Sequence, residues 1–124
     1  MVTRLLLILL VGIIFSNEIR ENTLLFCLNK NEPLLDLDSN GKLNRDSNNE
    51  INNFLSSRSS SYIIESWLSA ATENDYSGEI YLNRIYRIVF EDLSRTTLSI
   101  LKDDLSNLSS ILNVENEYIR KPYY

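Results

Sequence analysis

Carboxylates are the only side chains in this sequence that could serve as acid–base machinery, because its 124 residues include no histidine. Catalysis by Ser-His-Asp or Cys-His groups is therefore excluded within the chain. Adjacent carboxylates occur at Asp103-Asp104 and Glu91-Asp92. We expect the first pair on the solvent face of a helix and the second at its start, where negative charge is favourable. General acid–base catalysis needs carboxylates in a cleft. No pattern here indicates one, so we predict that this chain is not an enzyme.

A metal-binding pattern occurs at positions 36–44. Oxygen donors stand at the first, third and fifth ligand positions of an EF-hand loop, at Asp36, Asp38 and Asn40. The twelfth position requires a bidentate Glu and is Ser47, while Pro33 stands where the entering helix should run. We therefore expect a solvated hairpin turn at Asn40-Gly41, where positive φ is tolerated. A weak calcium site is the alternative, and we expect no cofactor.

Composition favours one small globular domain, with 44% apolar and 23% charged residues and a net charge of −5. Acidic residues are spread along the chain, which argues against nucleic acid as a partner because its phosphates require clustered Lys and Arg. The single cysteine, Cys27, cannot form an internal disulfide and argues against a zinc site. It lies in the apolar run 24–28, where we expect a buried, inert thiol.

The N-terminus is typical of a secretory signal peptide. Arg4 supplies a positive charge, residues 5–15 are apolar, and Ser16-Asn17 ends the run. Eleven residues form a helix about half as long as the ~30 Å core of a bilayer, so no stable membrane span is expected after cleavage. We predict a signal peptide at 1–16 and a linker at 17–22, with export to a secreted, periplasmic or extracellular location. An uncleaved anchor is the alternative.

Periodicity divides the remaining chain into six elements. Strand patterns occur at 23–29, 62–67, 80–91 and 114–119, and a short helix is expected at 48–55. A second helix begins at Asp92 or Ser94, either of which could cap it. Its apolar stripe follows spacings of 3, 4, 3 and 4, at Leu98, Leu101, Leu105, Leu108 and Leu112. The order predicts an α+β, ferredoxin-like βαββαβ fold, a four-stranded antiparallel sheet with two helices on one face, preceded by the signal-peptide helix.

The uncovered face of such a sheet is a candidate partner surface, because Tyr and Phe are frequent in these strands. Arg84 and Arg87 could bind anions, but a cross-strand charge pair with Glu115 or Glu117 is the more ordinary role. The chain end is extended in character, and Pro122 biases Lys121 further that way. Extended peptides commonly bind by adding a strand to a sheet edge.

These features together resemble the N-terminal prodomain (inhibitor I9 type) of secreted subtilisin-like serine proteases. The resemblance covers about 23–124. It is carried by Leu25-Phe-Cys-Leu28, by Leu82-Asn-Arg-Ile-Tyr-Arg-Ile88 within the strand 80–90, by the leucine helix and by Val114-Glu-Asn-Glu117. None of these motifs is specific alone. The segments 36–44 and 70–78 are longer than a minimal prodomain needs.

The resemblance implies a partner and a mode of binding. The open sheet face would pack on two parallel helices of a subtilisin-like catalytic domain, in cis or in trans, with Glu115 and Glu117 capping those helices. The tail would lie in the protease cleft as a product-like inhibitor, through Arg120, Lys121, Pro122, Tyr123 and Tyr124. Tyr123 or Tyr124 would fill the specificity pocket. The domain would also act as an intramolecular chaperone for the protease.

By this resemblance the prodomain-like domain spans 23–121, and 122–124 begin the processing region. The abrupt Tyr123-Tyr124 ending leads us to expect a fragment whose parent is a serine endopeptidase. A stand-alone secreted inhibitor of the same fold is one alternative. A secreted calcium-dependent surface module built around Asp36, Asp38 and Asn40 is another, from a different functional class.

Overall fold

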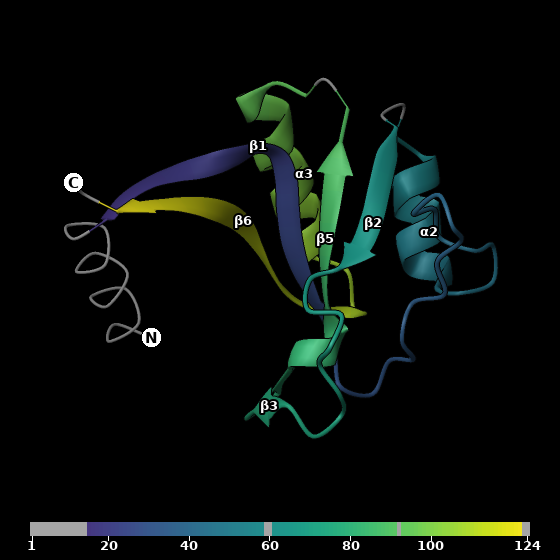
Figure 1. Ribbon diagram of the computed structural model, residues 1–124. Coiled ribbons are helices and arrows are strands. Elements are labelled where there is room, and N and C mark those ends of the chain that lie inside the picture. The colour runs from purple at the N-terminus through teal and green to yellow at the C-terminus, as the bar shows by residue number, and fades with distance from the viewer. Residues whose placement is uncertain (1–14, 59–60, 92, 123–124) are drawn as a thin grey trace.

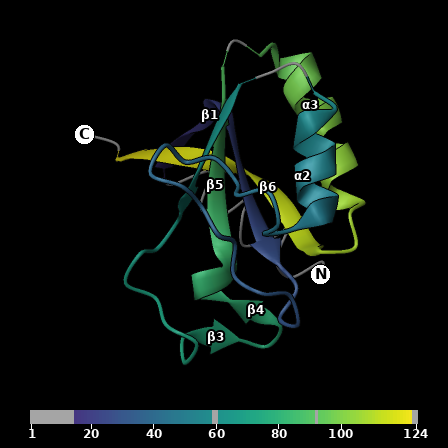
Figure 2. The ribbon, with the colours of Figure 1, turned by 90° about the vertical axis from the view of Figure 1, so that its right-hand side faces the viewer.

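The computed structural model describes residues 15–58, 61–91 and 93–122, which form a four-stranded sheet with two helices packed on one face (Figures 1 and 2). The sheet strands are β1 (Phe15–Leu28), β2 (Tyr62–Ser66), β5 (Ile85–Phe90) and β6 (Ile111–Pro122). The helices are α2 (Asn49–Ser56) and α3 (Arg95–Ser106). Two short strands, β3 (Tyr76–Ser77) and β4 (Ile80–Tyr81), form a separate hairpin. The expected α+β class is confirmed, while the predicted signal peptide at 1–16 falls almost wholly outside the described residues.

The sheet has the strand order β2-β5-β1-β6, and every neighbouring pair is antiparallel. The central strand β1 therefore pairs on one side with β5, where Phe26 faces Tyr86, and on the other with β6, where Phe26 faces Val114. This order is compatible with the expected ferredoxin-like arrangement. It places β5 beside β1, although β2 lies between them in the sequence. The sheet therefore cannot form until distant parts of the chain meet.

The core lies between the sheet and the two helices. Alternate residues of each strand point toward the helices, as period-two patterning requires. The Phe26 and Tyr86 rings stack directly across two strands, with 5.6 Å between their centroids. The buried apolar set is Leu24, Phe26, Leu28, Leu43, Ile51, Phe54, Leu55, Ile64, Tyr86, Ile88, Phe90, Leu98, Leu101, Leu105, Ile111 and Val114. Both helices thus contribute one apolar stripe to a single core.

Side-chain caps define where both helices begin. The Asn48 side chain accepts a hydrogen bond from the Ile51 amide at the start of α2, and Ser94 Oγ accepts one from the Thr97 amide at the start of α3. Such caps satisfy amide groups that have no partner within the helix. Of the two expected caps of the second helix, Ser94 is therefore confirmed, and Asp92 lies outside the described residues.

The second helix is shorter than its leucine spacing predicts. It ends at Ser106, so Leu108 packs against the core from the following turn and Leu112 already belongs to β6. The turn is fixed from outside the helix. The Glu50 carboxylate, in the first turn of α2, accepts hydrogen bonds from the amides of Ser109 and Ser110 at 3.1 and 2.7 Å. The prediction that one helix continues through Leu108 and Leu112 was therefore wrong.

Replacing Glu50 by glutamine should lower the free energy of unfolding by about 1 kcal/mol at neutral pH, because charge-assisted hydrogen bonds to this turn are lost. The Ser110 amide is the main reason that the pKa of Glu50 falls from 4.5 to about 2. A lowered folded-state pKa stabilises the fold above the ordinary pKa, and this contribution disappears as pH falls toward 2.

The test of this Glu50 effect is urea unfolding of the wild type and Glu50→Gln at pH 7 and pH 3. We expect the stability difference to shrink at pH 3. Glu73→Gln, which changes an exposed carboxylate in the loop before β3, is the matched control and should stay within about 0.5 kcal/mol. A Glu50→Gln effect that does not change with pH would contradict the assigned ionic contact.

The predicted strand 80–91 is divided in the structure. Ile80–Tyr81 forms β4, a 3₁₀ turn covers Leu82–Arg84, and only Ile85–Phe90 joins the sheet. Gly78, at φ +61°, allows β3 and β4 to form a hairpin in which Tyr76 and Tyr81 stack. A turn ending at Arg84 therefore redirects the chain, and the prediction of one continuous strand was wrong.

The expected hairpin at Asn40-Gly41 is confirmed, and it covers the edge of β2. Leu37 and Leu43 form a bridge, and Gly41 has φ +75°. The Gly41 carbonyl accepts a hydrogen bond from the Ile64 amide at 2.8 Å. The hairpin thereby satisfies a backbone group at an otherwise open sheet edge, as natural sheets commonly require.

Strands β1 and β6 are longer than predicted and continue past the sheet. Residues 15–19 pair with 118–122, and this two-stranded ribbon projects from the body of the domain (Figure 1). Residues 17–22, expected as a linker, lie within β1. Within 15–58, 61–91 and 93–122, no helix has the length and apolar character needed to cross a bilayer.

Candidate functional site

The sheet face opposite the helices is the candidate site, and we call it the open face. Its residues alternate with the core residues along the strands, because successive side chains point to opposite sides. They are Leu25, Cys27, Ile63, Glu65, Trp67, Ile85, Arg87, Val89, Glu115 and Glu117. Ile63 is 52% exposed and Trp67 is 37% exposed. Large apolar side chains left in solvent beside charged groups are typical of protein-binding surfaces.

A shallow depression marks the end of the open face near β4. It has a volume of about 130 Å³ and is lined by Leu25, Trp67, Ile80 and Ile85, among others. Cys27 also lines it, is 2% exposed, and donates a weak hydrogen bond from Sγ to the Leu28 carbonyl. Burial raises the pKa of this thiol. A protonated, enclosed thiol is a poor nucleophile and metal ligand, so the prediction of a buried Cys27 is confirmed.

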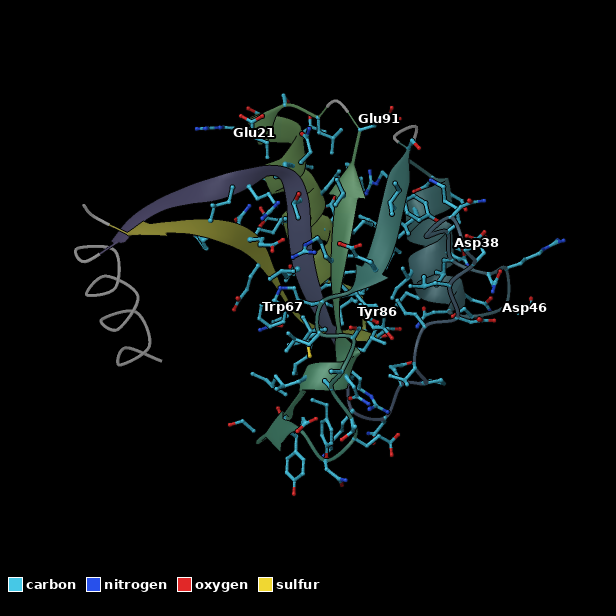
Figure 3. All side chains as sticks on the ribbon, in the orientation of Figure 1. Glu21, Asp38, Asp46, Trp67, Tyr86 and Glu91 are labelled. Atoms are coloured by element: carbon cyan, nitrogen blue, oxygen red, sulfur yellow. The ribbon has the colours of Figure 1, made fainter. Side chains whose placement is uncertain are left out.

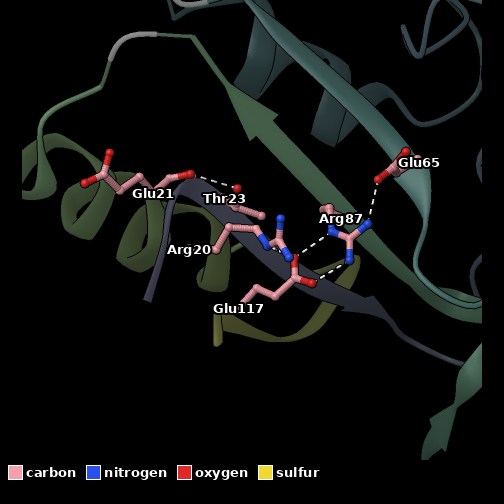
Figure 4. A network of polar contacts seen from close by, with 6 residues as sticks. All are labelled: Arg20, Glu21, Thr23, Glu65, Arg87 and Glu117. Carbon is pink, nitrogen blue, oxygen red and sulfur yellow. Dashed lines mark hydrogen bonds and ion pairs between the residues drawn. The ribbon is translucent and has the colours of Figure 1, made fainter. Parts of the chain in front are cut away.

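An ionic network crosses the centre of the open face (Figure 4). Arg87 on β5 donates from Nε to Glu117 Oε2 at 2.6 Å and from Nη1 to Glu65 Oε1 at 2.7 Å. Its Nη2 also donates to Glu117 Oε1, which makes the pair bidentate. Arg20 approaches the same carboxylate, with 3.7 Å between its Nε and Glu117 Oε2. The network ties β2, β5, β1 and β6 together on the side without helices.

Electrostatics keep this network ionised. The hydrogen bonds from Arg87 hold the pKa of the Glu117 carboxyl below its usual range, against the opposing effect of burial. The Glu117 and Glu65 carboxylates likewise raise the pKa of Arg87. Because bidentate arginine–carboxylate pairs fix geometry as well as charge, the centre of the open face is rigid. One of the two expected cross-strand partners of Arg87, Glu117, is confirmed.

The two acidic residues expected to cap partner helices occupy different environments. Glu117 is 8% exposed and its carboxylate is taken by Arg87 and Arg20. Glu115 is exposed, and within the described residues it forms no salt bridge. Of the pair, Glu115 therefore has its carboxylate free for a partner, whereas Glu117 serves the domain's own structure.

The predicted cleft tail lies in the ribbon, away from the open face. The backbone of Arg120 pairs with Asn17, that of Lys121 with Ser16, and that of Pro122 with Phe15. Tyr123 and Tyr124, the expected occupants of a specificity pocket, lie outside the described residues. The structure thus brings Glu115 and Glu117 together with the apolar open face, but it holds the tail in a separate antiparallel pairing.

The oxygen donors at 36–40 close a turn. Asp38 Oδ1 accepts hydrogen bonds from the amides of Asn40 and Lys42 at 2.8 and 3.0 Å, and the Asp36 amide bonds to Ser47 Oγ. In the described part of the chain, no three acidic, cysteine or histidine side chains gather as a metal site would require. Figure 3 shows Asp38 well apart from Trp67.

The remaining acid–base candidates lie in part where the sequence predicts: Asp103 and Asp104 are on α3 as expected, but Glu91 precedes the Ser94 cap and is not in the first turn of the helix. Asp103 is exposed on α3, and Asp104 pairs with Arg58 at 3.0 Å. Glu91 is exposed, and Asp92 lies outside the described residues. These carboxylates do not converge with the open face, so they give no reason to assign chemistry to it.

Sequence reasoning did not identify three open-face side chains: Arg20, Glu65 and Trp67. For the last two a signal was present, because Ile63, Glu65 and Trp67 alternate with core residues of the same strand. Arg20 had none. It reaches Glu117 only because β1 bulges at this point, and that irregularity depends on the pairing with β6.

The chain was compared with protein-family models, with curated proteins and with solved structures, and none of them matches it. What the molecule does must therefore be inferred from its own side chains. The informative features are an apolar and acidic sheet face that neither α2 nor α3 covers, and a last strand, β6, that is held in a ribbon.

Proposed function

We propose that this chain is a protein-binding domain of the prodomain type, which docks its open face on a subtilisin-like catalytic domain, inhibits it and assists its folding. The observation that carries the proposal is the exposure of Ile63 and Trp67 on a sheet face opposite both helices. Half-exposed Trp and Ile beside a rigid ionic centre favour association with a protein surface, because burying them removes apolar area from water.

The element order supports the same proposal. The sequence β1-α2-β2-β5-α3-β6 and the strand order β2-β5-β1-β6 are compatible with a ferredoxin-like fold that carries an added β3-β4 hairpin. The fold alone proves no function. What it contributes here is a broad sheet surface that leaves both helices free of the interface.

The acidic character of the open face favours a partner that presents helix N-termini. Glu115 is exposed beside Leu25 on the neighbouring strand, and unpaired amide groups at a helix start donate hydrogen bonds to such a carboxylate. Glu117 contributes indirectly, by holding Arg87 and hence the strands beneath the interface. In this proposal the chain performs no chemistry. The secretory route and the proteolytic activity of a parent chain belong to the same proposal.

Inhibition of subtilisin-like proteases tests the docking face. Ile63→Asp should raise the inhibition constant by about tenfold or more, or ~1.4 kcal/mol, because it places a charge in the apolar part of the interface. Ile100→Asp is the matched control, since Ile100 is similarly exposed, at 55%, but lies on α3. It should leave the inhibition constant within about twofold.

The assay is a titration of each full-length variant against several subtilisin-like proteases with a chromogenic peptide substrate. Thermal melting of the two variants checks that both remain folded. If Ile63→Asp and Ile100→Asp change the inhibition constant equally, the open face is not the docking surface. If the wild type neither binds nor inhibits any of these proteases, the proposed function is wrong.

A further inference from the structure

The ribbon holds the segment that the proposed function places in a protease cleft. Residues 118–122 of β6 pair in antiparallel register with 15–19 of β1, from Tyr118 opposite Ile19 to Pro122 opposite Phe15. Figure 1 shows this pair of strands extending from the body of the domain. A protease cleft binds one extended strand by pairing with its backbone. Strand β6 is the outermost strand of the sheet, so β1 occupies only one of the two edges of 118–122. A cleft that pairs with both edges of this segment would have to displace β1.

The ribbon is separated from the sheet by a large irregularity in β1. Four residues, 20–23, lie opposite the single residue Glu117 of β6. Asn22 within this bulge has φ +57°, in the left-handed region that non-glycine residues seldom adopt. Strand β5 pairs with β1 only from Thr23 onward. Among the described residues the ribbon therefore has no third strand, and its ladder is not continuous with that of the sheet.

Apolar side chains of the ribbon next to the sheet are half exposed. Ile19 and Tyr118, which face each other across it, are 46% and 53% exposed. A pair of strands without a third strand or a covering layer is at best marginally stable in water. Exchanging the β1 partner of 118–122 for another strand partner therefore has a small net cost, because backbone hydrogen bonds are made in both states.

The contacts of Glu117 allow the ribbon to open without disturbing the sheet. On the sheet side, Arg87 holds the Glu117 carboxylate by a bidentate contact. On the ribbon side, Arg20 approaches it at 3.7 Å and its side chain is 48% exposed. Loss of the Arg20 contact leaves Glu117 satisfied. The last residue held firmly by the sheet is thus Glu117, immediately before the segment in question.

We propose that residues 17–19, which remain after the expected cleavage at Ser16, act as an intramolecular latch, which pairs with 118–120 and competes with the protease cleft for that segment. This inference rests on the proposed function. It predicts that the open face can dock while the latch is closed, and that inhibition requires the latch to open at the 20–23 bulge. The apparent affinity of the tail for the cleft is then reduced by the fraction of molecules in which the latch is open.

A reversible disulfide across the ribbon tests the latch in the full chain. The pair Asn17→Cys and Arg120→Cys occupies directly opposed positions, where antiparallel Cα atoms are about 4.5–5.5 Å apart and suit a disulfide. Cys27→Ala in the same chain prevents mispairing. The reduced form of the identical protein is the matched control, so the substitution of Arg120 itself cancels from the comparison.

Two measurements are made on each redox form with the same subtilisin-like protease: surface binding by biolayer interferometry and the inhibition constant. We expect the oxidised form to bind but to inhibit at least about tenfold more weakly than the reduced form, since its latch cannot open. Single-cysteine variants should show no dependence on reductant.

Equal inhibition by the oxidised and reduced forms would overturn the latch and leave the proposed function intact. Loss of both binding and inhibition in the oxidised form alone would also overturn it, because docking by the open face would then depend on the ribbon. Absence of binding and inhibition in the wild type and both redox forms would instead refute the proposed function. Melting curves establish that each form is folded.

Discussion

Replacing Gly41 by alanine should lower the free energy of unfolding by about 3 kcal/mol, combining left-handed backbone strain of ~1–2 kcal/mol with steric overlap of ~1–3 kcal/mol. Gly41 has φ +75° in the hairpin that covers β2. An added Cβ would stand 2.5 Å from Ile63 Cγ2 and 3.0 Å from the Ile64 carbonyl oxygen. The Ile63 side chain can move, but the Ile64 backbone belongs to the sheet, so relief requires the hairpin to separate from the strand edge.

Gly78→Ala provides the matched control for Gly41→Ala. Gly78 has a similar φ of +61°, yet nothing lies within 4 Å of the position that its Cβ would take. We expect a loss of about 1 kcal/mol, from backbone strain alone. Urea unfolding of the three proteins measures both changes, and their difference isolates the close approach to β2. Equal losses for the two variants would show that the hairpin does not press on the strand edge.

The Gly41 turn illustrates which parts of this fold the sequence could predict. Asn-Gly specifies a turn by local backbone preference alone, and the strand cores and Asn48 cap likewise depend on near neighbours. The role of the hairpin could not be predicted. The bond between the Gly41 carbonyl and the Ile64 amide joins residues that are distant in sequence, and no periodic pattern specifies which edge a turn will cover.

Element boundaries were mispredicted where a distant group decides them. The leucine spacing continues through Leu108 and Leu112, so periodicity alone extends the helix. Glu50 binds the amides of Ser109 and Ser110 and ends that helix from another element. The same reason applies to the ribbon. From the sequence, residues 15–22 were predicted to belong to a signal peptide and a linker. Residues 15–19 instead form a strand because they pair with 118–122 of β6, about a hundred residues away.

The sequence predicted acidic residues of the candidate site, but it did not predict which side chains they contact. The sequence identified Glu115 and Glu117 as an acidic pair on the last strand, with equal roles. Their difference arises because β6 is separated from β5 by β1, and only Glu117 is positioned to meet Arg87 across that strand. Alternation assigns a side chain to a face. Alternation alone does not predict which charged side chains on that face will form ion pairs.

Replacing Glu117 by alanine should lower the free energy of unfolding by about 2–3 kcal/mol, slightly below the cost of breaking a fully buried ion pair. The carboxylate is 8% exposed and accepts a bidentate contact from Arg87, whose side chain is 25% exposed. Its removal leaves part of the guanidinium without a partner in a partly enclosed site. Urea unfolding at pH 7 measures the loss.

Glu65→Ala is the matched control, because Glu65 binds the same guanidinium at 2.7 Å from a side chain that is 54% exposed. Exposed ion pairs contribute little, so we expect a loss of about 0.5 kcal/mol. A loss as large as that of Glu117→Ala would mean that the charge on Arg87, rather than its enclosure with Glu117, governs the effect.

The pH dependence of Glu117→Gln separates the ionic contribution of this residue from its packing. Arg87 lowers the pKa of Glu117 in the folded state. A group whose folded-state pKa is lowered contributes stability above its ordinary pKa, near 4.5, and loses that contribution as pH falls through the folded value. Glutamine keeps the shape but cannot titrate. The stability difference between wild type and Glu117→Gln should therefore be constant from pH 6 to 8 and shrink below pH 4.5. A difference that persists unchanged at pH 3 would place the stabilisation in shape and hydrogen bonding, and not in the charge at the centre of the open face.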